Sequence, residues 1–78
     1  MGIKKNLKKL LKEPTEMRID ELKNVLLHFG FILKNIKGSH YTFAHPRIDK
    51  ITVPVHNGKA KKRYLEIIKN HLINNKLI

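Results

Sequence analysis

Apolar residues near the start of the chain recur at helical spacing and are separated mainly by lysines. They are Ile3, Leu7, Leu10 and Leu11. This pattern predicts a short basic amphipathic helix over residues 3–13 that ends before Pro14. A membrane-surface helix and an RNA-facing arm are two alternative interpretations. Because the segment is short and has no aromatic anchor, we expect it to pack its leucine stripe on the domain or on a partner.

Two further stretches follow the helical period. Residues 19–29 have acids in the first turn, and Gly30 is placed to end the helix with Phe31 folding back on it. The apolar stripe of this helix is Ile19, Leu22, Val25, Leu26 and Phe29. Lys23 and Asn24 are expected to face water, and residues 15–18 look like a linker. A last helix over residues 60–74 would bury Tyr64, Leu65, Ile68 and Leu72.

Between these helices the pattern changes to alternation, which predicts three strands over residues 31–36, 40–45 and 50–55. The connections between them are short, so the strands should form an antiparallel meander. Pro54 cannot donate a ladder hydrogen bond, which indicates an edge or a strand end. We therefore expect an α+β fold of the order α-β-β-β-α, in which two helices cover one face of a three-stranded sheet. Residues 1–14 would form a basic N-terminal extension, and residues 15–78 the domain.

The net charge of the chain indicates which classes of partner it attracts. Seventeen Lys and Arg against six acids give a net charge of +11. A field of that sign attracts nucleic acid first, an anionic membrane second and an acidic protein third, although a merely basic surface is an alternative. Cysteine is absent, which excludes disulfides and thiolate–zinc sites. No apolar run approaches the roughly 20 residues that span a bilayer, and we expect a cytoplasmic protein without a membrane partner.

Several enzyme classes lack their motifs here. The sequence has no glycine-rich phosphate loop, no nucleophile elbow and no His-Glu-x-x-His spacing. The acids are too scattered for a paired-carboxylate mechanism. Strand alternation places His40 and His45 on opposite faces, so His40, His45 and His56 are not expected to form a metal site. The sequence therefore predicts neither a metal nor another cofactor.

One histidine remains a candidate for catalysis. His40 follows Gly38 and Ser39 at the mouth of the second strand, and histidine exchanges protons near neutral pH. Such a base can deprotonate the 2′-hydroxyl of RNA and thereby create an internal nucleophile. Gly38 would let the backbone approach a phosphate, Ser39 would donate to it, and Lys37 and Lys59 would balance its charge. From the residues alone, a histidine that only caps the turn is an equally good interpretation.

A basic cluster marks the point where the last helix is expected to begin. It consists of Lys59, Lys61, Lys62 and Arg63. Helix N-termini favour anions, and double-stranded-RNA-binding domains carry a lysine cluster at this point of an α-β-β-β-α fold. The cluster therefore predicts contact with RNA phosphates, with a solvated helix end as the alternative. It does not by itself predict cleavage.

Residues 18–72 resemble the HicA family of mRNA interferase toxins. The resemblance is carried by HFGF at residues 28–31, by KGSHYTFAHP at 37–46 and by ITVPVHNGKAKKRYLEIIK at 51–69. It implies a double-stranded-RNA-binding-like fold, with the family's catalytic histidine at His40 and its flanking residues at Gly38 and Ser39. It also implies ribosome-independent cleavage of mRNA, growth arrest and neutralisation by a HicB-like antitoxin that covers the site.

The resulting hypothesis is a toxin of a type II toxin–antitoxin system that acts as a metal-independent endoribonuclease, with His40 as general base. A non-catalytic RNA-binding module of the same fold is the main alternative, and an interaction subunit for an acidic partner is a third. His45 and His56 are candidates for the general acid. The sequence leaves open the oligomeric state and the role of residues 1–13, which extend beyond the family pattern.

Overall fold

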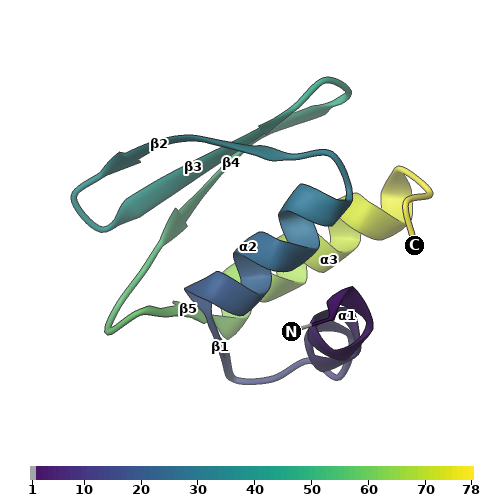
Figure 1. Ribbon diagram of the computed structural model, residues 1–78, viewed down its shortest axis with the longest axis horizontal. Helices are drawn as coiled ribbons and strands as arrows, with labels where there is room; N and C mark the ends of the chain where they lie inside the picture. The colour runs from purple at the N-terminus through teal and green to yellow at the C-terminus, as the bar shows by residue number, and fades with distance from the viewer. Residues whose placement is uncertain (1) are drawn as a thin grey trace.

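The fold has two helices packed between a three-stranded sheet and a short N-terminal helix (Figure 1). The computed structural model describes residues 2–78. Along the chain the elements are α1 (Ile3–Leu11), β1 (Glu16–Arg18), α2 (Ile19–His28), β2 (Ile32–Lys37), β3 (His40–His45), β4 (Ile48–Pro54), β5 (Lys59–Lys61) and α3 (Lys62–Asn74). Helices α2 and α3 cover the same face of the β2–β4 sheet, and α1 lies on their far side. The predicted α+β arrangement is therefore confirmed.

The three-stranded sheet is an antiparallel meander in the order β2-β3-β4. Lys37 pairs with His40, so Gly38 and Ser39 form a two-residue turn between β2 and β3. Gly38 has a φ of 60°, and glycine at the first central position is typical of the type II′ turn, whose twist suits a hairpin. Strand β4 lies at one edge and ends at Pro54, as the missing N–H of proline predicted.

The core lies between the helices and the inner face of the sheet. Phe43 and Val53 are completely buried there. The other buried apolar residues are Leu10, Met17, Ile19, Leu22, Val25, Leu26, Phe31, Ile48, Ile51, Val55, Ala60, Leu65, Ile68 and Leu72. Most residues of the predicted stripes of α2 and α3 are among them, because a 3.6-residue period places their apolar side chains on one face. Phe29, which was also predicted for the α2 stripe, is only partly buried. Tyr41 and Tyr64 are half-buried at the margin of this core.

Helix α2 ends where its glycine allows the chain to turn back. Gly30 has a φ of 95°, and the N–H of Phe31 donates to the carbonyl of Leu26 at 3.0 Å. Phe31 is buried by this return of the chain, which is the expected consequence of an αL cap. The residue thus belongs to the helix cap rather than to the first predicted strand. Strand β2 begins one residue later, at Ile32.

Residues 15–18 are not the linker that the sequence predicted. Glu16–Arg18 form strand β1, which pairs antiparallel with β5 in a separate two-stranded ribbon. Met17 faces Ala60 across this ribbon, and both are buried. Because residues 59–61 are used as a strand, the last helix begins at Lys62 rather than at residue 60. The pairing explains why the linker and the start of the last helix were both predicted wrongly, since neither short strand exists without the other.

Helix α1 is docked on the domain. Leu10 is 1% exposed, and Ile3 and Leu7 pack against the core, as the leucine stripe predicted. Leu11, by contrast, is 43% exposed and does not belong to the docked face. The prediction that Asn24 faces water is also wrong in part. Its side chain faces α1 and accepts a hydrogen bond at 3.0 Å from the buried side chain of Asn6.

Candidate functional site

His40 lies at the start of β3, on a backbone that is fixed from two sides. It pairs with Lys37 on β2 and with Pro54 on β4. The carbonyl of Ser39 also accepts a hydrogen bond at 2.7 Å from the N–H of Val55, which ties the turn to the end of β4. The side chain is exposed, and no side-chain hydrogen bond or ion pair among residues 2–78 involves its ring. An anchored backbone thus carries a histidine whose two ring nitrogens are free.

The outer face of the sheet surrounds this histidine. Phe43 points into the core, so the alternation of β3 places His40 and Thr42 on the face away from the helices. The hydroxyls of Thr42 and Thr52 lie 3.2 Å apart across β3 and β4. Lys37 is directly opposite His40 and shares its face, because paired residues of antiparallel strands point the same way. The structure therefore brings Lys37, the Gly38–Ser39 turn and His40 together in one hairpin end.

His45 has a different environment from His40. The N–H of Arg47 donates to its Nδ1 at 3.0 Å, so its Nε2 carries the proton and donates to the carbonyl of Phe29 at 3.1 Å. The ring also stacks obliquely on Phe31, with a centroid distance of 4.7 Å. Both nitrogens are thus engaged in joining β3 to the end of α2. His45 serves this contact, and it is a poor candidate for the general acid.

His56 lies between the hairpin end and the basic cluster. It exchanges two backbone hydrogen bonds of 2.9 Å with Lys59 around a tight turn. The turn uses left-handed backbone at Asn57 and Gly58, and its side chains point to solvent. In Figure 1 the β2–β3 turn and the β4–β5 connection lie at the same end of the molecule. The exposed His56 remains a candidate acid at that end.

The basic cluster does not occupy a helix N-terminus as a unit. Lys59 and Lys61 belong to β5, and only Lys62 and Arg63 lie in the first turn of α3. One N–H at this helix start is already used, because Lys62 donates to the carbonyl of Thr15 at 2.9 Å. Lys61 is also the N-cap residue of α3, so the prediction of a lysine-rich helix start is wrong only for Lys59, which lies within the ribbon.

Sequence reasoning missed a carboxylate inside this cluster. Glu16 of β1 contacts Lys59 at 2.9 Å and Lys61 at 3.3 Å, one through each carboxylate oxygen. These two lysines lower the pKa of Glu16, Lys59 more strongly than Lys61, so its carboxylate stays ionised at neutral pH. Glu66 also approaches Lys62, at 3.9 Å. The only signal in the sequence is that Glu16-Met17-Arg18 and Lys59-Ala60-Lys61 both alternate polar, apolar and polar.

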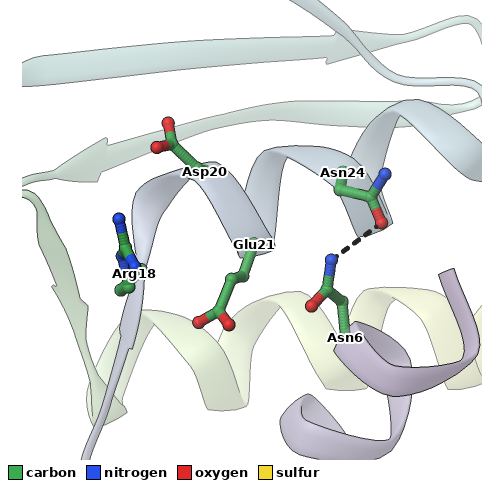
Figure 2. A pocket seen from close by; sticks show the side chains of 5 residues that line it. All are labelled: Asn6, Arg18, Asp20, Glu21 and Asn24. Atoms are coloured by element: carbon green, nitrogen blue, oxygen red, sulfur yellow. Dashed lines mark hydrogen bonds between the residues drawn. The ribbon is translucent and has the colours of Figure 1, made fainter. Parts of the chain in front are cut away.

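A hollow of the protein lies away from this end (Figure 2). It measures about 340 Å³ and opens between α1 and the beginning of α2. Its lining residues are Asn6, Arg18, Asp20, Glu21 and Asn24. It contains no histidine, and in Figure 2 Asp20 points away from Glu21, so the two acids do not converge. The candidate site is therefore an exposed surface at the hairpin end, a shape suited to a polymer that is bound along its length.

Two features of the described chain bear on other functions. Among residues 2–78, no three His, Cys, Asp or Glu side chains come close enough together to hold a metal ion. None of the helices in this part of the chain is long and apolar enough to cross a bilayer.

A three-stranded antiparallel sheet with two helices on one face defines the protein as a small α+β protein with the order α-β-β-β-α in its main layer. The family model for the HicA toxin of bacterial toxin–antitoxin systems matches residues 19–71, from α2 to near the end of α3. The chain belongs to the HicA toxin family. No curated protein and no solved structure matches it. The match includes His40 and the basic cluster, whereas α1 and β1 lie outside it.

Proposed function

We propose that this HicA toxin is an endoribonuclease that cleaves mRNA with His40 as its general base. The observation that carries the proposal is the ring of His40, exposed and without a hydrogen-bond partner among residues 2–78, on a turn fixed by Lys37 and Val55. A base of this kind can accept a proton only if its nitrogens are not already committed, as those of His45 are.

The proposed reaction begins at this histidine. His40 removes the proton of a 2′-hydroxyl, and the resulting oxygen attacks the neighbouring phosphorus. The bond from phosphorus to the 5′-oxygen breaks, which gives a 2′,3′-cyclic phosphate and, after a proton is supplied from a general acid, a 5′-hydroxyl. Lys37 lies on the same face as His40 and would counter the charge that develops on the phosphate. Because the nucleophile is part of the RNA, this step needs no metal ion.

The contacts to the remainder of the RNA are assigned to two places. Gly38 and Ser39 present backbone and a hydroxyl beside His40, and we assign them to the scissile phosphate. Lys59, Lys61, Lys62 and Arg63 lie at the same end of the molecule and would hold phosphates further along the strand. We further propose that residues 15–78 form the catalytic domain and residues 1–14 an extension of it. A HicB-like antitoxin would inhibit the enzyme by covering the hairpin end.

The test compares the wild type with His40→Ala and with a matched control, His28→Ala. His28 is also an exposed histidine, but it lies at the end of α2. Each protein is incubated with mRNA in the presence of EDTA after its melting temperature has been compared with that of the wild type. We expect cleavage by the wild type and His28→Ala, and a loss of roughly 10²–10⁴-fold in His40→Ala. Equal cleavage by all three proteins would exclude His40 as the base, and cleavage that requires added metal would exclude the metal-free mechanism.

A second candidate function is supported by the basic cluster alone. Its lysines and Arg63 lie on the ribbon and on α3, and their contacts do not depend on His40. A non-catalytic RNA-binding module of this fold would bind RNA with a strong dependence on salt. It would leave the length of the RNA unchanged over hours, in the wild type as in His40→Ala, which separates it from the nuclease.

A further inference from the structure

Helix α1 displays an accumulation of positive charge that the chain itself does not balance. The exposed lysines are Lys4, Lys5 and Lys8 of α1 and Lys12, the C-cap residue at its end. None of the four lies within ion-pair distance of a carboxylate in residues 2–78. They repel one another at i, i+3 and i, i+4 spacing, and the first two also oppose the positive end of the helix dipole. Like charges at these spacings destabilise a helix, and no carboxylate among residues 2–78 offsets them, which indicates that an external anion does.

The face that carries these lysines has a fixed orientation. On one side of α1, Lys9 donates to the buried carboxylate of Glu21 at 2.6 Å, and Asn6 donates to Asn24 (Figure 2). Beyond its C-terminal end, Glu13 accepts a hydrogen bond from Lys69 of α3 at 2.7 Å. Leu10 is meanwhile buried beneath the helix. The lysines are therefore held outward by contacts that α1 makes with both α2 and α3.

The lysine side chains also frame a hollow on the surface. It measures about 240 Å³, and the residues that line it are Lys5, Lys8, Lys9 and Lys12. Lys5, Lys8 and Lys12 lie on successive turns, because each step of three or four residues advances the helix by roughly 5–6 Å. A row of ammonium groups with this spacing matches an anion that repeats along a line. A polynucleotide strand has that form, with one phosphate for each nucleotide.

Two other classes of partner fit this face less well. A helix that lies on a membrane inserts its apolar side, but Ile3, Leu7 and Leu10 are already packed on the core. Protein interfaces are depleted in lysine relative to the rest of the surface, whereas this face consists of lysines. A phosphate backbone needs only accessible cations, which this face supplies.

We propose that the face formed by Lys4, Lys5, Lys8 and Lys12 is a second binding surface for the RNA substrate. The proposal rests on the proposed function for the identity of the polyanion. Helix α1 lies on the far side of α2 and α3 from the sheet, so an RNA that reaches both His40 and α1 must pass around the molecule (Figure 1). The extents of the protein are 31 × 26 × 23 Å, so only an RNA of some length can do so. The surface therefore selects long single strands over short ones.

The binding test uses the full chain and a 2′-O-methyl RNA, which keeps its phosphates but offers no 2′-hydroxyl for cleavage. The variant Lys5→Gln/Lys8→Gln/Lys12→Gln retains Lys9 and its contact with Glu21. The matched control, Lys23→Gln/Lys34→Gln/Lys76→Gln, has the same net charge. Each phosphate contact of a single strand contributes about 0.7 to the magnitude of the slope of log K against log salt. For the triple glutamine variant of Lys5, Lys8 and Lys12, called the α1 variant below, we therefore expect this magnitude to be smaller by about 2. This corresponds to roughly 100-fold weaker binding at 0.1 M salt, with a much smaller change in the control.

A charge-preserving variant and vesicles complete the binding test. Lys5→Arg/Lys8→Arg/Lys12→Arg should retain the wild-type slope, because arginine keeps the positive charge. Equal slopes for the α1 variant and its control would overturn the proposal. A second outcome would also overturn it: the wild type binds phosphatidylserine vesicles and the α1 variant does not, while both proteins bind RNA with the same affinity. Circular dichroism shows whether the glutamine variant keeps α1, and glutamine is a good helix former.

Cleavage separates this inference from the proposed function. Wild type and the α1 variant are compared on RNAs of about 6 and about 30 nucleotides, where the shorter covers one local binding site only. We expect equal rates on the short RNA and a slower rate for the α1 variant on the long one at limiting RNA. If the protein cleaves RNA and the α1 variant matches the wild type on both RNAs, the proposal of an α1 surface is refuted but the role of His40 is not. Binding that depends on α1 without any cleavage refutes the nuclease and leaves the α1 surface in place.

Discussion

Glu16 provides a sharp test of the basic cluster, because it occupies the place that a phosphate would take. Its two oxygens contact Lys59 at 2.9 Å and Lys61 at 3.3 Å, and all three side chains are at least one-third exposed. An RNA that binds there must displace the carboxylate. We expect Glu16→Gln to bind RNA more tightly than the wild type, because its amide carries no charge to compete with the phosphates.

The size of the effect follows from the number of released lysines. If both Lys59 and Lys61 then contact phosphates, the slope of log K against log salt rises in magnitude by about 1.4, at 0.7 for each contact to a single strand. At 0.1 M salt this amounts to at most about 25-fold tighter binding. The Lys–Glu contacts are exposed and therefore screened, so we expect the substitution to change the melting temperature little.

The assay is fluorescence anisotropy with 2′-O-methyl RNA at several salt concentrations. The matched control is Glu13→Gln, which also removes one negative charge and also releases a lysine, Lys69, but outside the cluster. An increase in slope for Glu16→Gln that exceeds the one for Glu13→Gln supports the argument. Weaker binding by Glu16→Gln would refute it, since Glu16 would then be needed to hold the lysines in place. An equal gain in both variants would show that only net charge matters.

Two further predictions concern stability. Leu10→Ala should reduce the free energy of unfolding by about 2–5 kcal/mol if α1 unfolds together with the domain, which urea denaturation measures; a much smaller loss would show that α1 detaches on its own. The second prediction concerns acid. Lys9 lowers the pKa of Glu21 and Lys69 that of Glu13, so each carboxylate stabilises the fold at pH values above its ordinary pKa of 4.5. That stability is lost as the pH falls through the lowered folded pKa values. The melting temperature of the wild type should therefore decrease when the pH is lowered below about 4.5, and the decrease should be smaller in Glu21→Gln.

The parts of the fold that sequence predicted are those specified by neighbouring residues. The Gly38–Ser39 turn sets the β2–β3 register directly, because glycine supplies the positive φ that the turn requires. Gly30 ends α2 for the same reason. The candidate His40 site could thus be located from sequence, since the turn, the strand and the histidine are contiguous. Its exposure also followed from alternation against Phe43.

The β1–β5 ribbon could not be predicted in the same way. Each strand has only three residues, and Glu16 and its partner Lys61 are 45 positions apart. Neither segment has enough apolar residues for a period to be recognised, because Met17 and Ala60, which pair with each other and are both buried, are the only ones. The Asn6–Asn24 contact was missed for a related reason. A polar residue on an outer helical face is predicted to meet water unless the docking of another helix is known.

These long-range contacts change where positive charge is available. The sequence placed it at residues 59–63, yet Lys59, Lys61 and Lys62 each lie within 4 Å of a carboxylate. The lysines on the outer face of α1 have no such neighbour among residues 2–78. A lysine already paired with a carboxylate must give up that contact before it binds phosphate, whereas an unpaired lysine gains the whole interaction. Substitution of the α1 lysines should therefore weaken binding of long RNA more, per charge removed, than substitution within the cluster. The opposite ranking would show that the cluster releases its carboxylates readily and remains the main anchor for RNA.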